Sequence, residues 1–131
     1  MKSAFSLLEL IFAIVILGIV ASFAIPKYID TKDSALVSTI KRDINTAVSS
    51  IQSYYLLNQK IDKISDAMTV NEVNWTVTDT KLSDKNSCLS LEIKITNNIK
   101  SLELTVDSTK ITSICKKIQD SGLITKSYEL Y

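Results

Sequence analysis

The stretch MKSAFSLLELIFAIVILGIVASFAIP, residues 1–26, decides the fold of this chain of 131 residues. Residues 10–26 carry no charged side chain, and their number approaches the ~20 residues that an α-helix needs to cross the hydrocarbon core of a bilayer. One carboxylate, Glu9, lies just inside this apolar segment. A carboxylate there costs roughly 2.5–3.5 kcal/mol on insertion scales and is usually tolerated only where it has a partner or a role. The sequence therefore predicts a membrane-spanning helix in which Glu9 requires a partner.

The hydrophobic pattern continues after Pro26 as one stripe of a helix, with spacings of three and four residues. The stripe consists of Leu36, Ile40, Ile44, Ala47, Val48, Ile51 and Tyr55. Because no strong stop signal interrupts residues 27–58, they are predicted to extend the apolar segment into one helix of more than ~50 residues. The alternative is a separate anchor joined to an amphipathic helix by a turn at residues 28–34.

Residues 59–131 are predicted to form a small globular head. Apolar and polar residues alternate in three predicted strands, 73–78, 88–96 and 102–106, and a final strand is expected over 123–130. The linker 96–100 suits a hairpin, since asparagine tolerates the left-handed backbone conformation. A head of this size has a marginal core of about 3–5 kcal/mol, so it must pack on the helix stripe.

A short helix is predicted around Ile111, Ile114, Cys115 and Ile118, capped by Ser108 and ended by Gly122. Together these elements predict an α+β fold, in which one long N-terminal helix packs on a small antiparallel sheet of three to four strands.

The composition excludes several functions. Fifteen basic and fourteen acidic side chains leave the chain nearly neutral, and histidine, the commonest general base and metal ligand, is absent. The acids Asp107, Asp120 and Glu129 are isolated, which argues against a calcium loop. Lys116, Lys117, Tyr128 and Tyr131 are the candidate contacts to nucleic acid, but so small a basic surplus is typical of a solvated face. We therefore expect no enzyme, no cofactor, no metal and no direct nucleic-acid binding.

Cys88 and Cys115 are the two cysteines of the chain. If the head lies outside the cytoplasm, the oxidising setting favours a disulfide that closes the loop between them. The alternative is a pair of buried thiols, since Cys115 lies on an apolar stripe and would pack well unbonded.

The hexapeptide Ala4-Phe5-Ser6-Leu7-Leu8-Glu9 resembles the processing site of the type IV pilins and type II secretion pseudopilins. The resemblance implies that a prepilin peptidase cuts between Ala4 and Phe5, removes leader 1–4 and leaves a methylated amine on Phe5. It also implies that Glu9 meets the N-terminal amine of a neighbouring subunit, which would pair a buried charge. One residue departs from the family pattern, because alanine stands at position 4 where the family strongly prefers glycine.

Gly18 and Pro26 also stand where type IV pilins have glycine and proline. A proline inside a helix removes one backbone hydrogen bond and clashes with the carbonyl four residues earlier, so we expect a kink near residues 22–26. The resemblance implies that residues 18–26 lose helical order when subunits pack. Gly18, Pro26, Phe5 and Glu9 are therefore the candidate assembly residues.

The family resemblance implies a structural subunit, a minor pilin or pseudopilin, of a type IV pilus, type II secretion or DNA-uptake filament. It would span the bacterial inner membrane through residues 5–26 and continue through 27–58 into a periplasmic head. Its partners would be other subunits, the peptidase, an assembly platform and an ATPase.

Three alternatives to this interpretation are a secretory signal peptide cleaved after Ala24, a plain membrane anchor, and a membrane-tethered binding module that does not polymerise. Residues alone do not distinguish a major from a minor pilin, or name the filament system, the cargo or the host.

Overall fold

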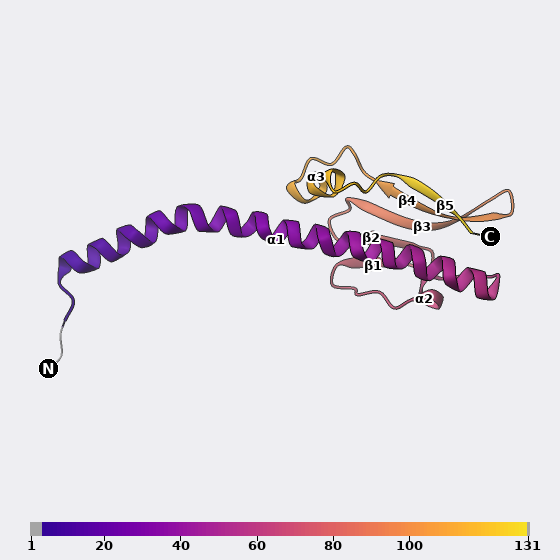
Figure 1. Cartoon of the computed structure of the whole chain (residues 1–131), viewed down its shortest axis with the longest axis horizontal. Coiled ribbons are helices and arrows are strands. Elements are labelled where there is room, and N and C mark those ends of the chain that lie inside the picture. The colour runs from indigo at the N-terminus through magenta and orange to yellow at the C-terminus, as the bar shows by residue number, and fades with distance from the viewer. Residues whose placement is uncertain (1–3, 131) are drawn as a thin grey trace. The chain divides into compact units, whose positions relative to one another are not determined.

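The computed structural model describes residues 4–130, so residues 1–3 of the predicted leader and Tyr131 lie outside the described residues. The chain divides into two compact units, Met1–Asp33 and Ser34–Tyr131. Figure 1 shows the elements in chain order: α1 (Leu7–Asn58), α2 (Ile64–Ala67), β1 (Trp75–Val77), β2 (Lys81–Asp84), β3 (Leu89–Thr96), β4 (Ile99–Val106), α3 (Ser113–Asp120) and β5 (Lys126–Glu129).

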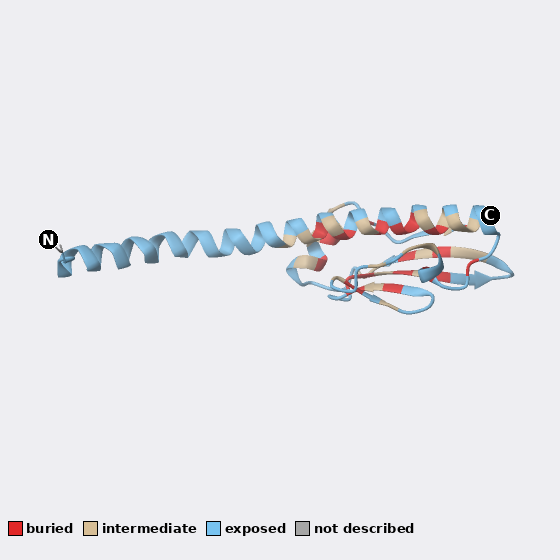
Figure 2. Cartoon of the chain, turned by 90° about the horizontal axis from the view of Figure 1, so that it is seen from below, coloured by how far each residue is buried: buried red, intermediate tan, exposed pale blue. Residues whose placement is uncertain are grey.

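Helix α1 contains 52 residues, which confirms the prediction of one long N-terminal helix. The alternative prediction of a turn at residues 28–34 is wrong, because this segment is helical throughout. In the second unit one side of α1 is buried, as the red segments in Figure 2 show. The buried side chains are Val37, Ile40, Ile44, Ala47, Val48 and Ile51, which include the centre of the predicted stripe.

The sheet has five antiparallel strands in the order β1-β2-β3-β4-β5. The α+β class and the packing of a long helix on an antiparallel sheet are confirmed, but the sheet has one strand more than the three to four expected. Strand β2 escaped prediction because Leu82 is its one apolar residue, which leaves no alternation to detect. Strand β5 is also shorter than the predicted 123–130.

The core lies between the buried side of α1 and one face of the sheet. The sheet contributes Trp75, Leu82, Leu89, Leu91, Ile93, Leu102 and Leu104. The indole Nε1–H of Trp75 donates to Asp43 Oδ2 on α1 at 2.9 Å, so the one polar atom of this buried side chain is satisfied. Two residues expected on buried strand faces are exposed: Val73, at 77 %, precedes β1, and Ile95, at 65 %, lies next to the β3–β4 hairpin loop.

The β3–β4 hairpin confirms the expected role of asparagine. Thr96 pairs with Ile99, and the two residues between them, Asn97 and Asn98, have φ of 52° and 65°. Positive φ at both central residues is the type I′ geometry, whose twist matches that of the flanking strands.

We expect Asn98→Val to lower the free energy of unfolding by about 1–2 kcal/mol, because a β-branched residue is disfavoured at positive φ. Asn98→Gly is the matched control and should be neutral or stabilising, since glycine adopts this conformation freely. Urea unfolding of the full chain in detergent micelles measures both changes. Equal effects of valine and glycine would contradict this account of the turn.

Helix α3 is shorter than the sequence predicted, and Ser108 is not its cap. The N-cap is Thr112, and Ile111, expected on the buried stripe, is 80 % exposed outside the helix. The cause is a turn after β4, in which the backbone N–H and hydroxyl of Thr109 both donate to the Asp107 carboxylate and hold its pKa below the usual value. The other end agrees with prediction, since Gly122 has φ of 92° and follows the last turn.

Candidate functional site at the N-terminus

The first turn of α1 places Ser6 and Glu9 in reciprocal contact. Ser6 stands immediately before Leu7, the first helical residue. The backbone N–H of Ser6 donates to Glu9 Oε2 at 2.9 Å, and the backbone N–H of Glu9 donates to Ser6 Oγ at 3.2 Å. The hydroxyl of Ser6 also donates to Glu9 Oε2 at 3.2 Å. This is a capping box, which satisfies two of the N–H groups that a helix start leaves without partners.

The sequence reasoning above identified Glu9 but missed Ser6. The signal was present as Ser-x-x-Glu directly before an apolar run, the usual signature of a capping box. The consequence is electrostatic as well as structural. The negative carboxylate lies at the positive end of the helix dipole and accepts a backbone N–H, which together lower the cost of its apolar surroundings.

We expect Ser6→Ala to destabilise the first turn of α1 by about 1 kcal/mol, because alanine can neither accept from Glu9 N–H nor donate to the carboxylate. Ser6→Thr keeps both hydrogen bonds and serves as the control. Hydrogen exchange of the amides at residues 6–10 in micelles measures the effect, with faster exchange expected only for the alanine variant. Identical exchange in both variants would contradict a capping role for Ser6.

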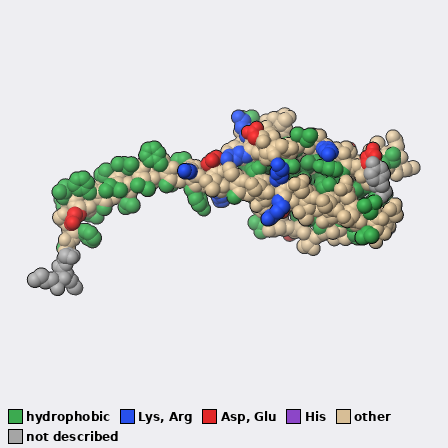
Figure 3. Space-filling model, viewed as in Figure 1, with side chains coloured by type: hydrophobic (Ala, Val, Ile, Leu, Met, Phe, Trp, Pro, Cys, Tyr) green, Lys and Arg blue, Asp and Glu red, His purple; other side chains and the backbone are tan. Residues whose placement is uncertain are grey.

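No part of the first unit, Met1–Asp33, covers the apolar side chains of α1 that the structure describes there. Residues 4–32 are all exposed, with Phe5 at 87 %, Leu7 at 75 % and Phe23 at 75 %. Figure 3 shows hydrophobic side chains, in green, along this part of the helix. By length and composition α1 can cross a membrane, although a signal sequence would meet the same criterion. Such a surface requires a cover of lipid or of other apolar helices.

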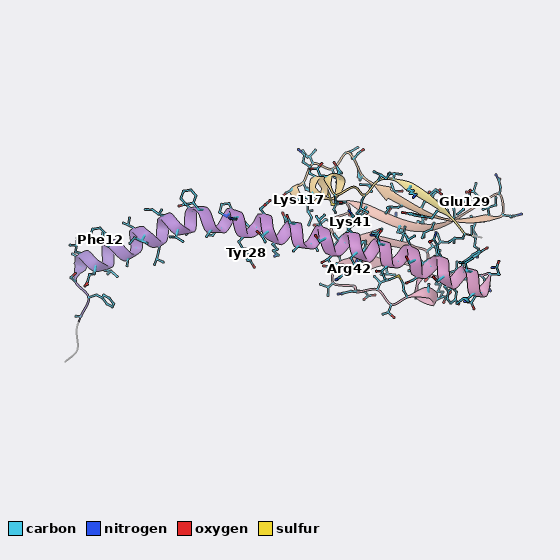
Figure 4. The ribbon with its side chains drawn as sticks, viewed as in Figure 1. Phe12, Tyr28, Lys41, Arg42, Lys117 and Glu129 are labelled. Carbon is cyan, nitrogen blue, oxygen red and sulfur yellow. A yellow bond between two sulfur atoms is a disulfide. The ribbon has the colours of Figure 1, made fainter. Side chains whose placement is uncertain are left out.

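The structure places Gly18 and Pro26 in the same weakly bonded stretch of α1. The hydroxyl of Ser22 donates to the Gly18 carbonyl at 2.7 Å, and Pro26 has no N–H to offer the Ser22 carbonyl. The helix changes direction between Phe12 and Tyr28, as Figure 4 shows. One helical hydrogen bond, that to the Ser22 carbonyl, is therefore missing from the stretch predicted to lose order.

Cys88 and Cys115 are joined by a disulfide with a Cα–Cα distance of 5.1 Å, and both are at most 1 % exposed. The bond attaches α3 to the residue before β3. The turn that carries Cys88 is fixed by the buried Asp84, whose carboxylate accepts the N–H groups of Cys88 at 2.7 Å and Leu89 at 2.9 Å. The two cysteines thus lie far from Phe5 and Glu9 in sequence and belong to the other unit.

Between residues 4 and 130 no group of three or more His, Cys, Asp or Glu side chains could hold a metal ion. An open groove of about 610 Å³ on α1 is lined by Ser38, Lys41, Arg42, Asn45, Thr46, Ser49 and Ser50. The Lys41 ammonium donates to the carbonyl of Ser121, and the Ser38 hydroxyl donates to the carbonyl of Ser34. The N-terminal segment is therefore the strongest candidate for a functional site.

An apolar helix with a capped carboxylate in its first turn, together with a small antiparallel sheet on which the same helix packs, is a pilin-like α+β fold. Residues 1–25 match the family described as the prokaryotic N-terminal methylation motif. The type II secretion system core protein G of Pseudomonas aeruginosa is 35 % identical to the chain over 57 residues, which are 44 % of this chain and 40 % of that protein. These two matches confirm the resemblance to the type IV pilin and pseudopilin family.

The match covers about two-fifths of the length of this relative, so it is confined to part of each protein. No solved structure matched the chain.

Proposed function

We propose that this protein is a structural subunit, a pseudopilin or minor pilin, that polymerises through α1. The observation that carries the proposal is Glu9, a charged side chain in the first turn of a helix whose apolar side chains are all exposed up to residue 32. Lipid tails alone could cover the apolar side chains, but hydrocarbon offers no counter-charge to a carboxylate. Neighbouring copies of the same helix offer both, provided that each has a free amine close to its own Glu9.

Cleavage between Ala4 and Phe5 would create that amine one residue before the capping Ser6. Phe5 lies two residues before the first helical residue, Leu7, and the backbone N–H of the next residue, Ser6, donates to Glu9 Oε2, so the new amine would lie close to the carboxylate of its own chain. In a single chain the capping box already satisfies the carboxylate in part. Between staggered chains, the amine of one would meet the Glu9 of the next, and a charge pair of this kind fixes the register of docking.

The weakly bonded stretch between Gly18 and Pro26 would serve the filament in a second way. Because Pro26 supplies no N–H, unwinding there breaks fewer helical hydrogen bonds than elsewhere in α1. Local loss of helix would let the membrane segment lengthen while residues 27–58 continue to carry the head.

The proposed setting is the bacterial inner membrane, with the head in the periplasm and later on a filament. Residues 5–26 would form the membrane and filament-core helix. The disulfide favours an oxidising compartment for the head. The relative bears the name of a type II secretion core protein, which supports a secretion pseudopilus over a pilus or a DNA-uptake filament. A prepilin peptidase, an assembly platform and an ATPase would be its partners, and the chain itself would be non-catalytic.

Mass spectrometry of the N-terminus tests the processing step. The mature chain, expressed with an active prepilin peptidase, should begin at Phe5 and carry one added methyl group. An intact Met1 would indicate a plain anchor or tethered module, and a start at Ile25 would indicate a secretory signal; either result would overturn the proposal.

A further inference from the structure

The exposed large apolar side chains of the second unit gather at its two ends. One end contains the last turn of α1 and the β3–β4 hairpin, and its exposed members are Leu56, Leu57, Ile95 and Ile99. The other end contains α3 and its disulfide, and its exposed members are Val73, Ile111 and Ile124. Lys41, which donates to the Ser121 carbonyl beside α3, and Leu56 are about 22 Å apart along α1. Figure 4 labels Lys117 and Glu129 at these opposite ends.

An apolar groove lies between α1 and β5 at the hairpin end. It has a volume of about 220 Å³ and is lined by Gln52, Leu56, Glu129 and Leu130. Pockets for small molecules usually have volumes of about 300–1,000 Å³, so this groove is better suited to a single side chain. Leu56 is 61 % exposed, which means that its apolar surface in the groove would gain from a cover.

Strand β5, one wall of the groove, is an edge strand of the described sheet. The N–H of Leu130 donates to the Lys100 carbonyl at 3.1 Å, so the main-chain groups of Leu130 face β4. Because these directions alternate along an antiparallel strand, the N–H and C=O groups of Ser127 and Glu129 face away from β4. Main-chain groups at an open edge recognise another polypeptide, which favours a protein over a lipid as the occupant of this groove.

Ile111, at 80 % exposed, lies in a well-fixed segment at the α3 end. Gln119 Nε2 donates to the carbonyl of Asp107 at 2.9 Å and to that of Lys110 at 3.1 Å, which ties the segment before α3 to the helix itself. The disulfide of Cys115 in turn attaches α3 to the sheet. An apolar side chain held in this way loses little conformational freedom when it docks.

Charge distinguishes Ile111 from the other exposed apolar side chains at this end. The residues that precede Ile111, Val73 and Ile124 are Lys110, Glu72 and Leu123. In the groove, Leu130 follows Glu129. If Ile111 lay against Leu130 with the two segments in the same direction, Lys110 would meet Glu129 as an opposite charge. Val73 in the same place would bring Glu72 against Glu129 as a like charge.

Lys110 and Glu129 are both available for such a pair. Both are exposed, and among residues 4–130 neither forms a salt bridge. The acid close to Lys110 in the chain, Asp107, accepts from the N–H and hydroxyl of Thr109. These hydrogen bonds, more than the charge of Lys110, hold the pKa of Asp107 below its usual value. A contact with Glu129 would therefore not require an existing ion pair to break.

We propose that the second unit docks head to tail on a second copy of this chain, with Ile111 of one copy in the groove beside Leu130 of the next and Lys110 paired with Glu129. A second copy is favoured over another protein because the same chain carries both complementary surfaces. Since these surfaces differ and lie at opposite ends of one unit, the contact does not close on itself and repeats along a filament. The inference rests on the proposed function and adds a contact between heads to it.

Carbodiimide cross-linking of sheared filaments and membranes of the full chain tests the contact. The reagent joins the Lys110 amine to the Glu129 carboxylate as an amide and takes up the water that is lost. Because the contact is head to tail, we expect a ladder of dimers, trimers and longer products on a denaturing gel. Mass spectrometry of the dimer should identify the peptide that joins Lys110 to Glu129, and no equivalent peptide should join Lys85 to Glu129.

Charge reversal supplies the matched variants. Lys110→Glu and Glu129→Lys should each lower filament yield about fivefold, and the two together should restore it, because the pair is then reversed and not broken. Lys85→Glu is the control. It changes another exposed lysine near the same end, whose N–H donates to the carbonyl of Asn74, and it should assemble like the parent chain.

Ile111→Ser should lower filament yield about tenfold or more, because it removes an apolar side chain that docking would bury. Val73→Ser is its control, since Val73 is 77 % exposed and should not enter the groove. Both substitutions are at exposed positions, so the urea midpoint of each variant should match that of the parent chain.

The outcomes separate this contact from polymerisation through α1. Filaments without a Lys110–Glu129 link, or a double reversal that assembles no better than either single variant, would overturn the contact and leave the proposed function intact. A ladder of linked chains without filaments would support the contact and contradict the proposed function. An inserted chain that forms neither would contradict both.

Discussion

Glu9→Ala is expected to leave the chain inserted in the membrane while reducing its incorporation into filaments by about 30-fold or more. Removing one partner of a buried, hydrogen-bonded charge pair costs about 2–5 kcal/mol, much of it from the charge left alone. Here the amine of the neighbouring Phe5 would be left without its carboxylate. Membrane insertion should persist, because the substitution removes a charge from an apolar helix and so favours the bilayer. Sheared filament fractions and membrane fractions, probed for the same chain, measure the two effects separately.

Glu9→Gln separates the charge from the helix cap. Glutamine is the other residue that closes a capping box, so the hydrogen bond to the Ser6 N–H can be kept while the charge is lost. We expect Glu9→Gln to assemble as poorly as Glu9→Ala, although its first turn exchanges amide protons as slowly as that of the parent chain. If the glutamine variant formed filaments normally, the capping box and not the charge pair would be the function of Glu9, and a tethered module would become the better description.

The parts of the fold that could be predicted from the sequence are those in which the spacing of apolar residues within one segment determines its structure. The stripe of α1 recurs at helical spacing, and the β3–β4 hairpin combines alternation with Asn97 and Asn98 at left-handed positions. Strand β2 could not be found in this way, because Leu82 is its one apolar residue and the neighbouring strands supply its pairing. Side-chain contacts also divide into those that lie within a short segment, which the sequence can predict, and those between distant segments, which it cannot. The Ser6–Glu9 cap lies within four consecutive residues, whereas the contacts Lys41–Ser121 and Ser34–Lys117 join residues about 80 positions apart in the chain.

The start of α3 shows how a local turn can override a periodic pattern. Ile111 has the spacing of a buried helical residue, but the Asp107–Thr109 turn directs the chain differently before the helix begins at Ser113. Competition of this kind between a side chain and the helix backbone is characteristic of Asp and Thr. The exposed position of Ile111 follows from that turn.

Cys88→Ala combined with Cys115→Ala is expected to lower the free energy of unfolding of the second unit by about 3–4 kcal/mol. The bond closes a loop of 27 residues, and on the chain-entropy model a loop of that length yields this stabilisation. The effect is large because the core of so small a head is itself worth only about 3–5 kcal/mol. Trp75, the single tryptophan of the chain and 1 % exposed, reports the transition by fluorescence during urea unfolding in detergent micelles.

The reduced parent chain distinguishes the cross-link from the packing of its sulfur atoms. Reduction breaks the bond but keeps both thiols in the core, so its effect measures the cross-link, and any further loss in the double alanine variant measures the two small cavities. Reductant should leave the unfolding of the variant unchanged. Because Asp84 and the N–H groups of Cys88 and Leu89 fix the β2–β3 turn without the bond, we expect the sheet to persist at low urea and α3 to separate first. A parent chain whose urea midpoint is the same before and after reduction would contradict a stabilising disulfide and leave the packing of Ile118 and Leu123 on the core to hold α3.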